Sequence, residues 1–353
     1  MKRTVALLLA VLLILSAVGC AQRTNVKTNG MDTNADGTKK EIASKDKYNF
    51  LVMGYDRIAM LADVIMLVSF DTEDKNMTIM QLPRDTYVEV EDNSYHKLNG
   101  IFNHFVSKAK KEDSKTPETD GCNMTAEYLE KALGIPIHYS AVMDLDGFGN
   151  IVDAVGGVNF YVPYPVHYED PAQNLYIHLE QKRYNLTGDQ AEQFVRFRSG
   201  YANADLGRGD AQKMFMTAFM ESVKANIGLS NVANVAGAVI NNVNTSMKVG
   251  DIVSFGKAFL SVELENTLMF TAPGELASSY YVLNKESMKN VLSEYFNIFE
   301  EDLTDEEVDN DGIFCDEDNE AVLESYEKPA DELKFDIHNA SDVSKDDIYV
   351  PVK

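Results

Sequence analysis

Residues 48–82 read YNFLVMGYDRIAMLADVIMLVSFDTEDKNMTIMQL, and this stretch decides the fold class. It contains three short apolar runs, at residues 48–54, 62–70 and 76–82. Polar turn residues separate them, as in the DTEDK segment at residues 71–75. This pattern is typical of buried β-strands that follow one another closely. The stretch therefore predicts the first three strands of a sheet.

Strands and helices alternate along the next part of the chain. Further strands are expected at residues 139–143 and 158–162, and apolar spacing predicts helices at residues 98–110, 125–133, 148–154 and 210–226. A capping-box pattern at Thr187 and Gln190 predicts a helix that continues to about residue 197. Residues 163–184 have no clear period and are expected to form a loop. This mixture predicts an α/β fold, with one layered body over residues 47–298.

The composition limits the possible partners. The chain has 353 residues, of which 45% are hydrophobic, so it can bury a sizeable core. Its formal charge is −24, but residues 300–353 contain 20 acidic and 4 basic residues and so account for −16 of it. The body is therefore only mildly acidic. Because no basic surface is evident, nucleic acid is excluded as a partner.

The N-terminus has the features of a targeting segment. Lys2 and Arg3 precede an apolar run at residues 5–18, which is short for a bilayer span but suits a signal peptide. The run leads into AVGC at residues 17–20, which is similar to a bacterial lipobox. We therefore expect a lipoprotein-type signal peptide at residues 1–20, with lipid on Cys20; the alternatives are an ordinary signal peptide and an uncleaved anchor. The protein would then act outside the cytoplasmic membrane.

Residues 21–46 and 299–353 differ from the body in composition. The first segment is polar and is expected to be a flexible tether, and the second is expected to be an acidic C-terminal extension. Residues 307–312 are similar to the front half of a calcium loop, but Asp318 stands where an EF-hand needs a bidentate Glu. A solvated acidic appendage is the preferred interpretation. Cys122 and Cys315 either form one disulfide or remain two separate thiols.

Arginine is concentrated in one stretch, FVRFRSGYANADLGRGDAQ at residues 194–212. The chain has eight arginines, six of them after residue 46, and three of those six are Arg196, Arg198 and Arg208. The planar arginine fork binds phosphate through paired hydrogen bonds. Guanidinium groups clustered beside Asp205 suggest a phosphate-bearing ligand. Structural ion pairs that hold a loop are an equally good explanation of the spacing.

Charged residues also lie at the ends of the first three predicted strands. Asp56 follows the first strand and Asp63 opens the second, so a short loop would bring both carboxylates to one edge of the sheet. Carboxylates together with a diphosphate suit Mg²⁺. The alternative, favoured by spacing alone, is that Asp56 is a turn residue and Asp63 a local cap. Arg84 lies at the exit of the third strand, and Lys97 precedes a predicted helix.

Together these motifs resemble the LytR-CpsA-Psr family of extracytoplasmic glycopolymer transferases. The similarity runs in order from about residue 48 to residue 297. It is carried by Asp56, Asp63, LPRDTYV at 82–88, HKLNG at 96–100, VDAVGGV at 152–158 and the arginine-rich stretch.

The resemblance implies a fold and an activity. The expected fold is a single α-β-α layered domain with a mixed central sheet and a lipid-binding tunnel. The expected reaction moves a glycopolymer from a polyprenyl-pyrophosphate carrier to peptidoglycan at the outer leaflet of the cytoplasmic membrane, leaving a phosphodiester link. By this resemblance Asp56 and Asp63 are metal-associated, with Mg²⁺ as the cofactor. The phosphate-contacting positions are Arg84, Lys97, Arg196, Arg198, Asp205, Arg208 and Gln212.

Two positions depart from the family pattern. Leu61 stands where an arginine usually precedes the second metal-associated Asp, and Ala211 stands where a second arginine often precedes Gln212. Arg57 is near enough in sequence to supply the missing charge. The losses leave two other functions open: a non-catalytic binder of lipid-linked saccharides, and a hydrolase that cleaves the pyrophosphate with water. A third is an adhesin that uses the acidic extension with calcium.

Overall fold

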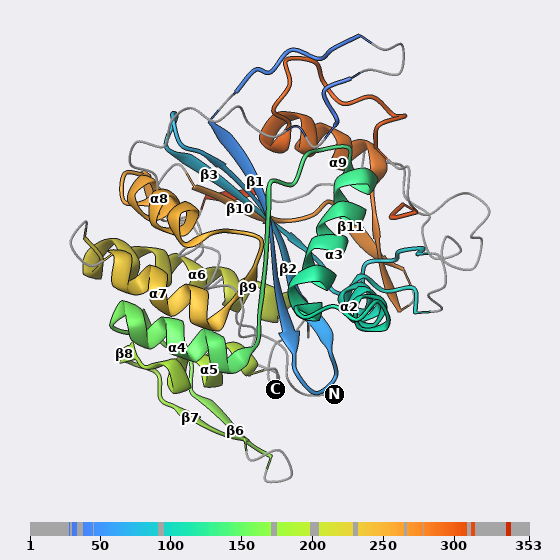
Figure 1. The fold of residues 1–353 in the computed structure, drawn as a ribbon. Coiled ribbons are helices and arrows are strands. Elements are labelled where there is room, and N and C mark those ends of the chain that lie inside the picture. The colour runs from blue at the N-terminus through green and yellow to red at the C-terminus, as the bar shows by residue number, and fades with distance from the viewer. Residues whose placement is uncertain are drawn as a thin grey trace.

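A seven-stranded mixed sheet forms the centre of the molecule (Figure 1). The computed structural model describes residues 28, 30–33, 38–44, 46–90, 95–170, 175–197, 205–228, 232–264, 267–277, 279–308, 312–314 and 337–339, with the backbone only at 170, 175, 205–210 and 337–339. The strand order is β13-β10-β3-β2-β1-β4-β9. The bounds are β1 (Lys47–Asp56), β2 (Leu61–Asp71), β3 (Asn76–Leu82), β4 (Tyr139–Met143), β9 (Asn244–Thr245), β10 (Thr267–Thr271) and β13 (Ile337–Asn339).

Both faces of this sheet are buried. Along β1, Phe50 and Val52 belong to the apolar core on one face, and Leu51 and Met53 belong to the core on the other. A strand that is buried on both faces is apolar at successive positions and does not alternate with polar residues. This explains the continuous runs in the sequence, and it confirms the first three predicted strands.

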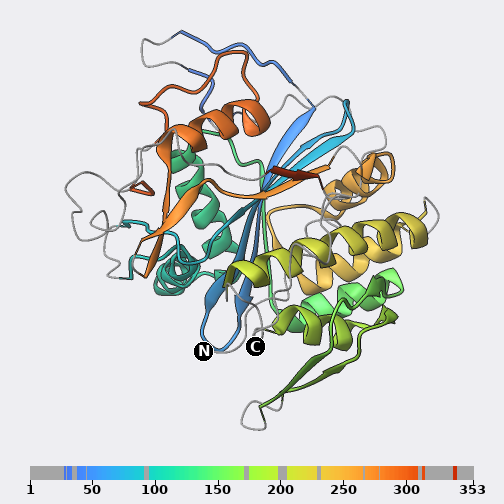
Figure 2. The same ribbon diagram turned by 180° about the vertical axis from the view of Figure 1, so that it is seen from behind.

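Helices cover the sheet on both sides (Figures 1 and 2). One layer consists of α4 (Leu145–Val155), α5 (Gly188–Arg196), α6 (Asp205–Asn226), α7 (Val232–Asn242) and α8 (Val249–Phe259). The other consists of η1 (Leu98–Gly100), α2 (Ile101–Lys111), α3 (Pro117–Leu133), α9 (Lys285–Val291) and the π-helical turn η4 (Leu292–Phe296). The predicted α-β-α layering with a mixed sheet is confirmed. The lipid tunnel stays a prediction.

Two local predictions were wrong. The helix predicted at residues 125–133 begins earlier, because Pro117 occupies its first turn, where a missing N–H costs nothing. The loop predicted at residues 163–184 contains a hairpin of β6 (Val166–Asp170) and β7 (Leu175–Leu179), followed by β8 (Arg183–Leu186), which pairs with β5 (Val158–Tyr161). A second small hairpin is formed by β11 (Gly274–Ala277) and β12 (Tyr280–Leu283).

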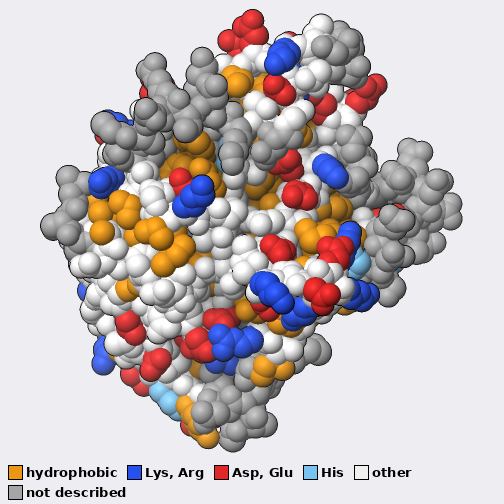
Figure 3. Space-filling view, in the orientation of Figure 1, with side chains coloured by type: hydrophobic (Ala, Val, Ile, Leu, Met, Phe, Trp, Pro, Cys, Tyr) orange, Lys and Arg blue, Asp and Glu red, His pale blue; other side chains and the backbone are white. Residues whose placement is uncertain are grey.

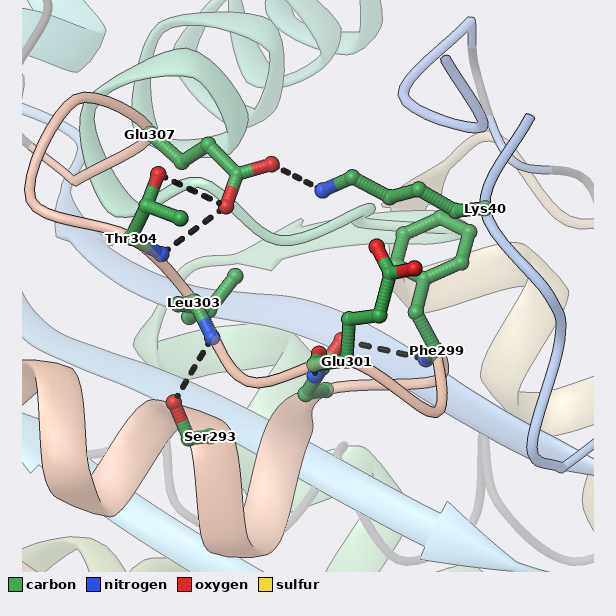
Figure 4. A network of polar contacts seen from close by, with 8 residues as sticks. Lys40, Ser293, Phe299, Glu301, Leu303, Thr304 and Glu307 are labelled. Carbon is green, nitrogen blue, oxygen red and sulfur yellow. Dashed lines mark hydrogen bonds and ion pairs between the residues drawn. The ribbon is translucent and has the colours of Figure 1, made fainter. Parts of the chain in front are cut away.

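Residues 38–44, here called the arm, are fixed to the start of the C-terminal extension. Ile42 bridges to Phe299, and the Ala43 amide donates to the Ile298 carbonyl at 2.9 Å. The Lys40 ammonium contacts the Glu307 carboxylate and lies 5.0 Å from the centre of the Phe299 ring (Figure 4). The described part of the predicted tether therefore packs on the body.

The first residues of the predicted acidic extension also belong to the body. The side chains that share the core with α2 and α3 are Leu303, Val308, Ile313 and Phe314. Glu307, the first residue of the calcium-loop pattern, is engaged by Lys40, and residues 309–311 and 315–318 of that pattern lie outside the described residues. The positions of the domain boundaries stay a prediction.

The structure does not describe the predicted leader or two of the three cysteines. Cys20 and the apolar run before it lie outside them, as does Cys315. No helix within the described part of the chain has both the length and the apolar character to cross a bilayer. Cys122 is a buried free thiol in α3, and burial raises its pKa to about 12.

Candidate active site

The candidate site lies at one edge of the sheet, here called the rim. β1 ends at Asp56, and β4, which runs parallel to it, ends at Met143. β2, which is antiparallel to β1 and β3, begins at Leu61, and β3 ends at Leu82, so four strand termini meet at this edge. Ligand sites in α/β proteins collect where the carboxyl ends of strands meet. Basic and acidic side chains are interspersed over the lower part of the molecular face in Figure 3.

Asp63 and Arg84 form an ion pair across neighbouring strands. Ile65 pairs with Leu82, and continuing this register by two residues places Arg84 opposite Asp63. A β-bulge also falls here, because Tyr55 pairs with Ala62 and Gly54 with Val64, which leaves Asp63 as the extra residue. Arg84 Nη1 lies 2.8 Å from Asp63 Oδ1, and only 5% of the Asp63 side chain is exposed. The bulge therefore turns a nearly buried carboxylate toward the arginine.

The same arginine is linked to Lys97 through Asp85. Arg84 Nε lies 3.6 Å from Asp85 Oδ2, and Lys97 Nζ lies 3.1 Å from Asp85 Oδ1. Lys97 is also held 5.4 Å from the centre of the Tyr280 ring. The predicted substrate-binding Lys97 and the predicted catalytic Arg84 thus belong to one chain of alternating charges.

Asp56 organises the turn between β1 and β2. Its Oδ1 accepts hydrogen bonds from the amides of Ile58, at 2.7 Å, and Ala59, at 3.1 Å. This is an Asx turn, so the turn role that spacing favoured for Asp56 is confirmed. The turn projects Arg57, whose guanidinium contacts Asp144 and lies 3.3 Å from Asp146 Oδ2. The pKa of Arg57 is raised, and the negative charge of Asp144 is the largest cause.

Arg196 lies at the end of α5, where its Nη1 is 2.7 Å from Glu192 Oε1 one helical turn earlier. The Arg196 side chain is 11% exposed. Burial raises the pKa of Glu192; Arg196 opposes this shift, and the charges of Asp146 and Asp189 add to it. The close approach of Gly188 to the Gly149 backbone places α5 beside α4, whose first turn contacts Arg57. The capping box that fixes the start of α5 is confirmed: the Gln190 amide donates to the Thr187 hydroxyl at 3.4 Å.

The N-terminal half of α6 reaches the end of β3. Gln212 is 1% exposed, and its Oε1 accepts a hydrogen bond from Gln81 Nε2 at 3.2 Å. Asp205 and Arg208 lie in the first turns of α6, but their side chains are outside the description, and Arg198 lies outside the described residues altogether. The roles predicted for these three residues therefore stay predictions.

The two departures from the family pattern have simple structural descriptions. Leu61 begins β2 and pairs with Asp56 across the turn. Ala211 is 3% exposed and packs in the core beneath α6. Neither residue adds a hydrogen-bond donor from its side chain to the rim. Arg57 brings a guanidinium to this edge, but it is engaged with the two aspartates of α4.

Sequence reasoning missed the acidic partners of these cations. Asp144 also caps α4, because its Oδ1 accepts from the Gly147 amide at 2.9 Å, and this cap could have been recognised from the Asp-x-x-Gly spacing. Asp85 lies within the LPRDTYV motif, but the sequence pattern predicts no role for it. The described rim side chains comprise six acidic and four basic groups, a net charge of −2 with all ionised: Asp56, Asp63, Asp85, Asp144, Asp146, Glu192, Arg57, Arg84, Lys97 and Arg196.

The donor chemistry at the rim fits a cation that is shared with a phosphate ligand. Among the described residues no group of three or more His, Cys, Asp or Glu is arranged to hold a metal ion. Mg²⁺ commonly takes only one or two carboxylates and fills its octahedron with phosphate oxygens and water. Asp56 and Asp63, on adjacent strand ends, are suitable for that limited role.

Comparison with known proteins identifies the relationships of the chain. It is 24% identical over 267 residues to the polyisoprenyl-teichoic acid–peptidoglycan teichoic acid transferase TagV of Bacillus subtilis; the match covers 70% of this chain and 64% of that protein. It is 25% identical to the transferase TagU of Oceanobacillus iheyensis, over 80% of this chain and 87% of that one.

Solved structures share the fold. The crystal structure of B. subtilis TagV superposes with a TM-score of 0.55 at 21% identity, covering 73% of this chain and 98% of that one. Protein gbs0355 of Streptococcus agalactiae gives a TM-score of 0.58 at 18% identity, covering 76% and 93%. The model of the LytR_cpsA_psr family matches residues 16–297. The chain therefore belongs to the LytR_cpsA_psr family.

Proposed function

We propose that the protein transfers a glycopolymer from a polyprenyl-pyrophosphate carrier to peptidoglycan and leaves a phosphodiester link. Membership of the family supports this, as do the names of the relatives, which describe transfer of teichoic acid from a polyisoprenyl carrier to peptidoglycan. The observation that carries the proposal is the rim, where Arg84 is paired with the nearly buried Asp63 and linked through Asp85 to Lys97.

The proposed work of the arginines is electrostatic. Phosphoryl transfer depends on positioning and on stabilising the negative charge of the phosphate oxygens, and arginine forks are suited to both. Arg84 and Arg196 would bind the pyrophosphate, with Arg198 and Arg208 as further donors and Arg57, Lys97 and Gln212 around the sugar-bearing phosphate. Asp205 would accept the proton of the incoming sugar hydroxyl, or would orient an arginine.

We also propose that Mg²⁺ takes part, held through Asp56 and Asp63. Mg²⁺ commonly takes one or two carboxylates together with phosphate oxygens, and Asp56 and Asp63 lie at neighbouring strand ends. When bound, Mg²⁺ would screen the anionic phosphates. The polyprenyl chain would lie in the predicted tunnel, and a lipidated Cys20 would hold the protein at the outer face of the membrane.

The test is transfer of a lipid-linked polymer by variants of the full chain. We expect R84A and R196A each to lower the transfer rate by about a hundredfold or more, the size of effect seen when one transition-state donor is removed. R183A is a matched control, because Arg183 donates to Asn159 at 3.0 Å in the β5–β8 pair, outside the rim. Undiminished transfer by both R84A and R196A would remove the arginines from the mechanism.

A second candidate is a binder or hydrolase of polyprenyl-pyrophosphate-linked saccharides. Leu61 and Ala211, which add no donor to the rim, favour it. A hydrolase would release the polymer into water at the same rate with and without peptidoglycan, and a binder would retain the lipid without forming product. If L61R raised transfer, and carrier release required peptidoglycan, both alternatives would be excluded.

A further inference from the structure

The β6–β7 hairpin has one apolar face and one face of charged and titratable residues. Val166, Ile177 and Leu179 are buried in the core. The opposite face carries His167 and Glu169 on β6. It also carries His178 on β7 and Glu180, which directly follows β7. These four side chains are about half to two-thirds exposed. The hairpin packs beside α4 and α5, and no role at the rim has been assigned to it (Figure 1).

The two histidines face each other with one nitrogen each. His167 is directly opposite His178 in the antiparallel register. Their Nδ1 atoms are 3.5 Å apart, whereas the ring centres are 5.7 Å apart. Both rings therefore turn Nδ1 toward a common point between the strands.

A glutamate engages the other nitrogen of each ring. His167 Nε2 lies 3.2 Å from Glu180 Oε1, and His178 Nε2 lies 3.1 Å from Glu169 Oε1. A carboxylate beside Nε2 favours the tautomer that carries its hydrogen there and leaves the Nδ1 lone pair exposed. The result is two lone pairs directed at one gap. That arrangement is unfavourable unless a proton or a cation lies between them.

The gap is of the size that a metal ion requires. A hydrogen bond between nitrogens at 3.5 Å would be longer than the ordinary range of about 2.7–3.2 Å, so a shared proton fits it poorly. Two metal–nitrogen bonds of about 2.0–2.1 Å at a tetrahedral angle span about 3.4 Å. Carboxylate, imidazole and metal in a row is also the usual second-shell arrangement of metal-binding histidines.

We propose that His167 and His178 form a binding site for a divalent transition metal, with Zn²⁺ as the first choice, and that Glu169 and Glu180 orient the two rings. The protein supplies two imidazole ligands, and water or a donor from another molecule completes the coordination. The site has two protein ligands and is therefore smaller than a group of three or more His, Cys, Asp or Glu, none of which is found in the described part of the chain. Imidazole also suits Cu²⁺ and Ni²⁺.

The metal would join the two strands near the open end of the hairpin, at the second residue pair of the register. The alternative is that the four side chains form only two exposed His–Glu contacts, which would contribute little to stability. The two interpretations differ in one measurable respect, because only the metal site requires both histidines together. The site is independent of the proposed transfer reaction, so neither result decides the other.

The experiment is a Zn²⁺ titration of the full-length chain, purified without a polyhistidine tag, followed by calorimetry. We expect one site that is lost in H167Q and in H178Q, and that is weakened about tenfold in E169Q and E180Q. Hydrogen exchange of the amides of residues 166–170 and 175–179 should slow when Zn²⁺ is added. Cu²⁺ bound to the wild type should show nitrogen coupling from two imidazoles in its paramagnetic resonance spectrum.

H104Q is the matched control, because it removes one histidine from α2 and keeps both hairpin ligands. The acidic extension is present in every variant, so any Zn²⁺ that it binds is common to all of them. Equal Zn²⁺ uptake by the wild type and the H167Q/H178Q double variant would overturn the proposal, as would the absence of hairpin protection on adding Zn²⁺.

Discussion

At the scale of single residues, the Asp63–Arg84 pair combines a structural role with a proposed catalytic one. Asp63 is almost inaccessible to solvent, so removing Arg84 leaves a nearly buried carboxylate without its 2.8 Å partner. We expect R84Q to lower the free energy of unfolding by roughly 2–3 kcal/mol. Urea denaturation followed by circular dichroism would measure this loss.

A double-mutant cycle separates the pair from its surroundings. In the D63N/R84Q variant neither member of this pair is charged. Its unfolding free energy should therefore be higher than the value obtained by subtracting both single-variant losses from the wild-type value. R183Q serves as the comparison for loss of an exposed arginine, with a change within about 0.5 kcal/mol. If the losses of unfolding free energy in the two single variants simply added up in the double variant, the ion pair would contribute no coupling free energy.

At the scale of elements, Lys40 supplies a side-chain ion pair that ties the arm to the start of the C-terminal extension. Its side chain is 6% exposed and engages Glu307, whereas the side chain of the neighbouring Lys39 is 82% exposed. We expect K40A to lower the unfolding free energy by roughly 1–3 kcal/mol and to speed proteolysis of the arm. K39A is the matched control and should change stability by less than about 0.5 kcal/mol.

This contact should also depend on pH. Burial raises the pKa of Glu307, but hydrogen bonds from Lys40 and Thr304 outweigh burial, so the pKa lies below its ordinary value of 4.5. A carboxyl with a lowered folded-state pKa stabilises the protein above its unfolded pKa, and this contribution is lost as the pH falls through the folded value. The stability difference between wild type and K40A should therefore be full at neutral pH and shrink below about pH 4.5. A constant difference across that range would contradict the assignment.

The contact between α4 and α5 depends on a glycine at position 188. A Cβ on Gly188 would lie 2.3 Å from the Gly149 carbonyl oxygen, which belongs to backbone and cannot rotate away. We expect G188A to destabilise the protein by about 1–3 kcal/mol and to displace α5 with Arg196. G237A in α7 is the control, since a Cβ there meets nothing within 4 Å and should stabilise by roughly 0.5–1 kcal/mol. Thermal unfolding would reveal opposite shifts, and shifts of the same sign would count against the close packing.

At the scale of the whole molecule, the start of the C-terminal extension completes the core. A chain that ends at Phe299 loses Leu303, Val308, Ile313 and Phe314 from the layer that contains α2 and α3. We expect this truncation to lower the midpoint of thermal unfolding by more than 10 °C or to prevent folding, since each buried apolar side chain contributes roughly 1.5–3 kcal/mol. A chain that ends at Asn339 keeps every described contact and is the control. Equal midpoints for the two chains would be inconsistent with this packing.

The sequence predicted those parts of the fold that have a strong local signal. The doubly buried strands β1, β2 and β3 each contain apolar residues at successive positions, and the α5 capping box lies within four consecutive residues. The β6–β7 hairpin was missed because one of its faces carries histidine and glutamate. At the rim, the contact of Arg57 with Asp144 joins residues 87 positions apart, and no local pattern encodes that distance. Arg57 was predictable as a cation of the site, but its partners Asp144 and Asp146 are brought to it only by the β1–β4 pairing.

Lys47 and Asp56 are the two ends of one ten-residue strand, so the junction with the arm and the rim lie about 30 Å from each other. The arm therefore packs at the pole that faces away from the rim. A large ligand can approach the rim without meeting the arm. A fluorescent reporter placed on the arm would likewise record how the molecule is oriented while leaving the arginine-bearing edge unobstructed.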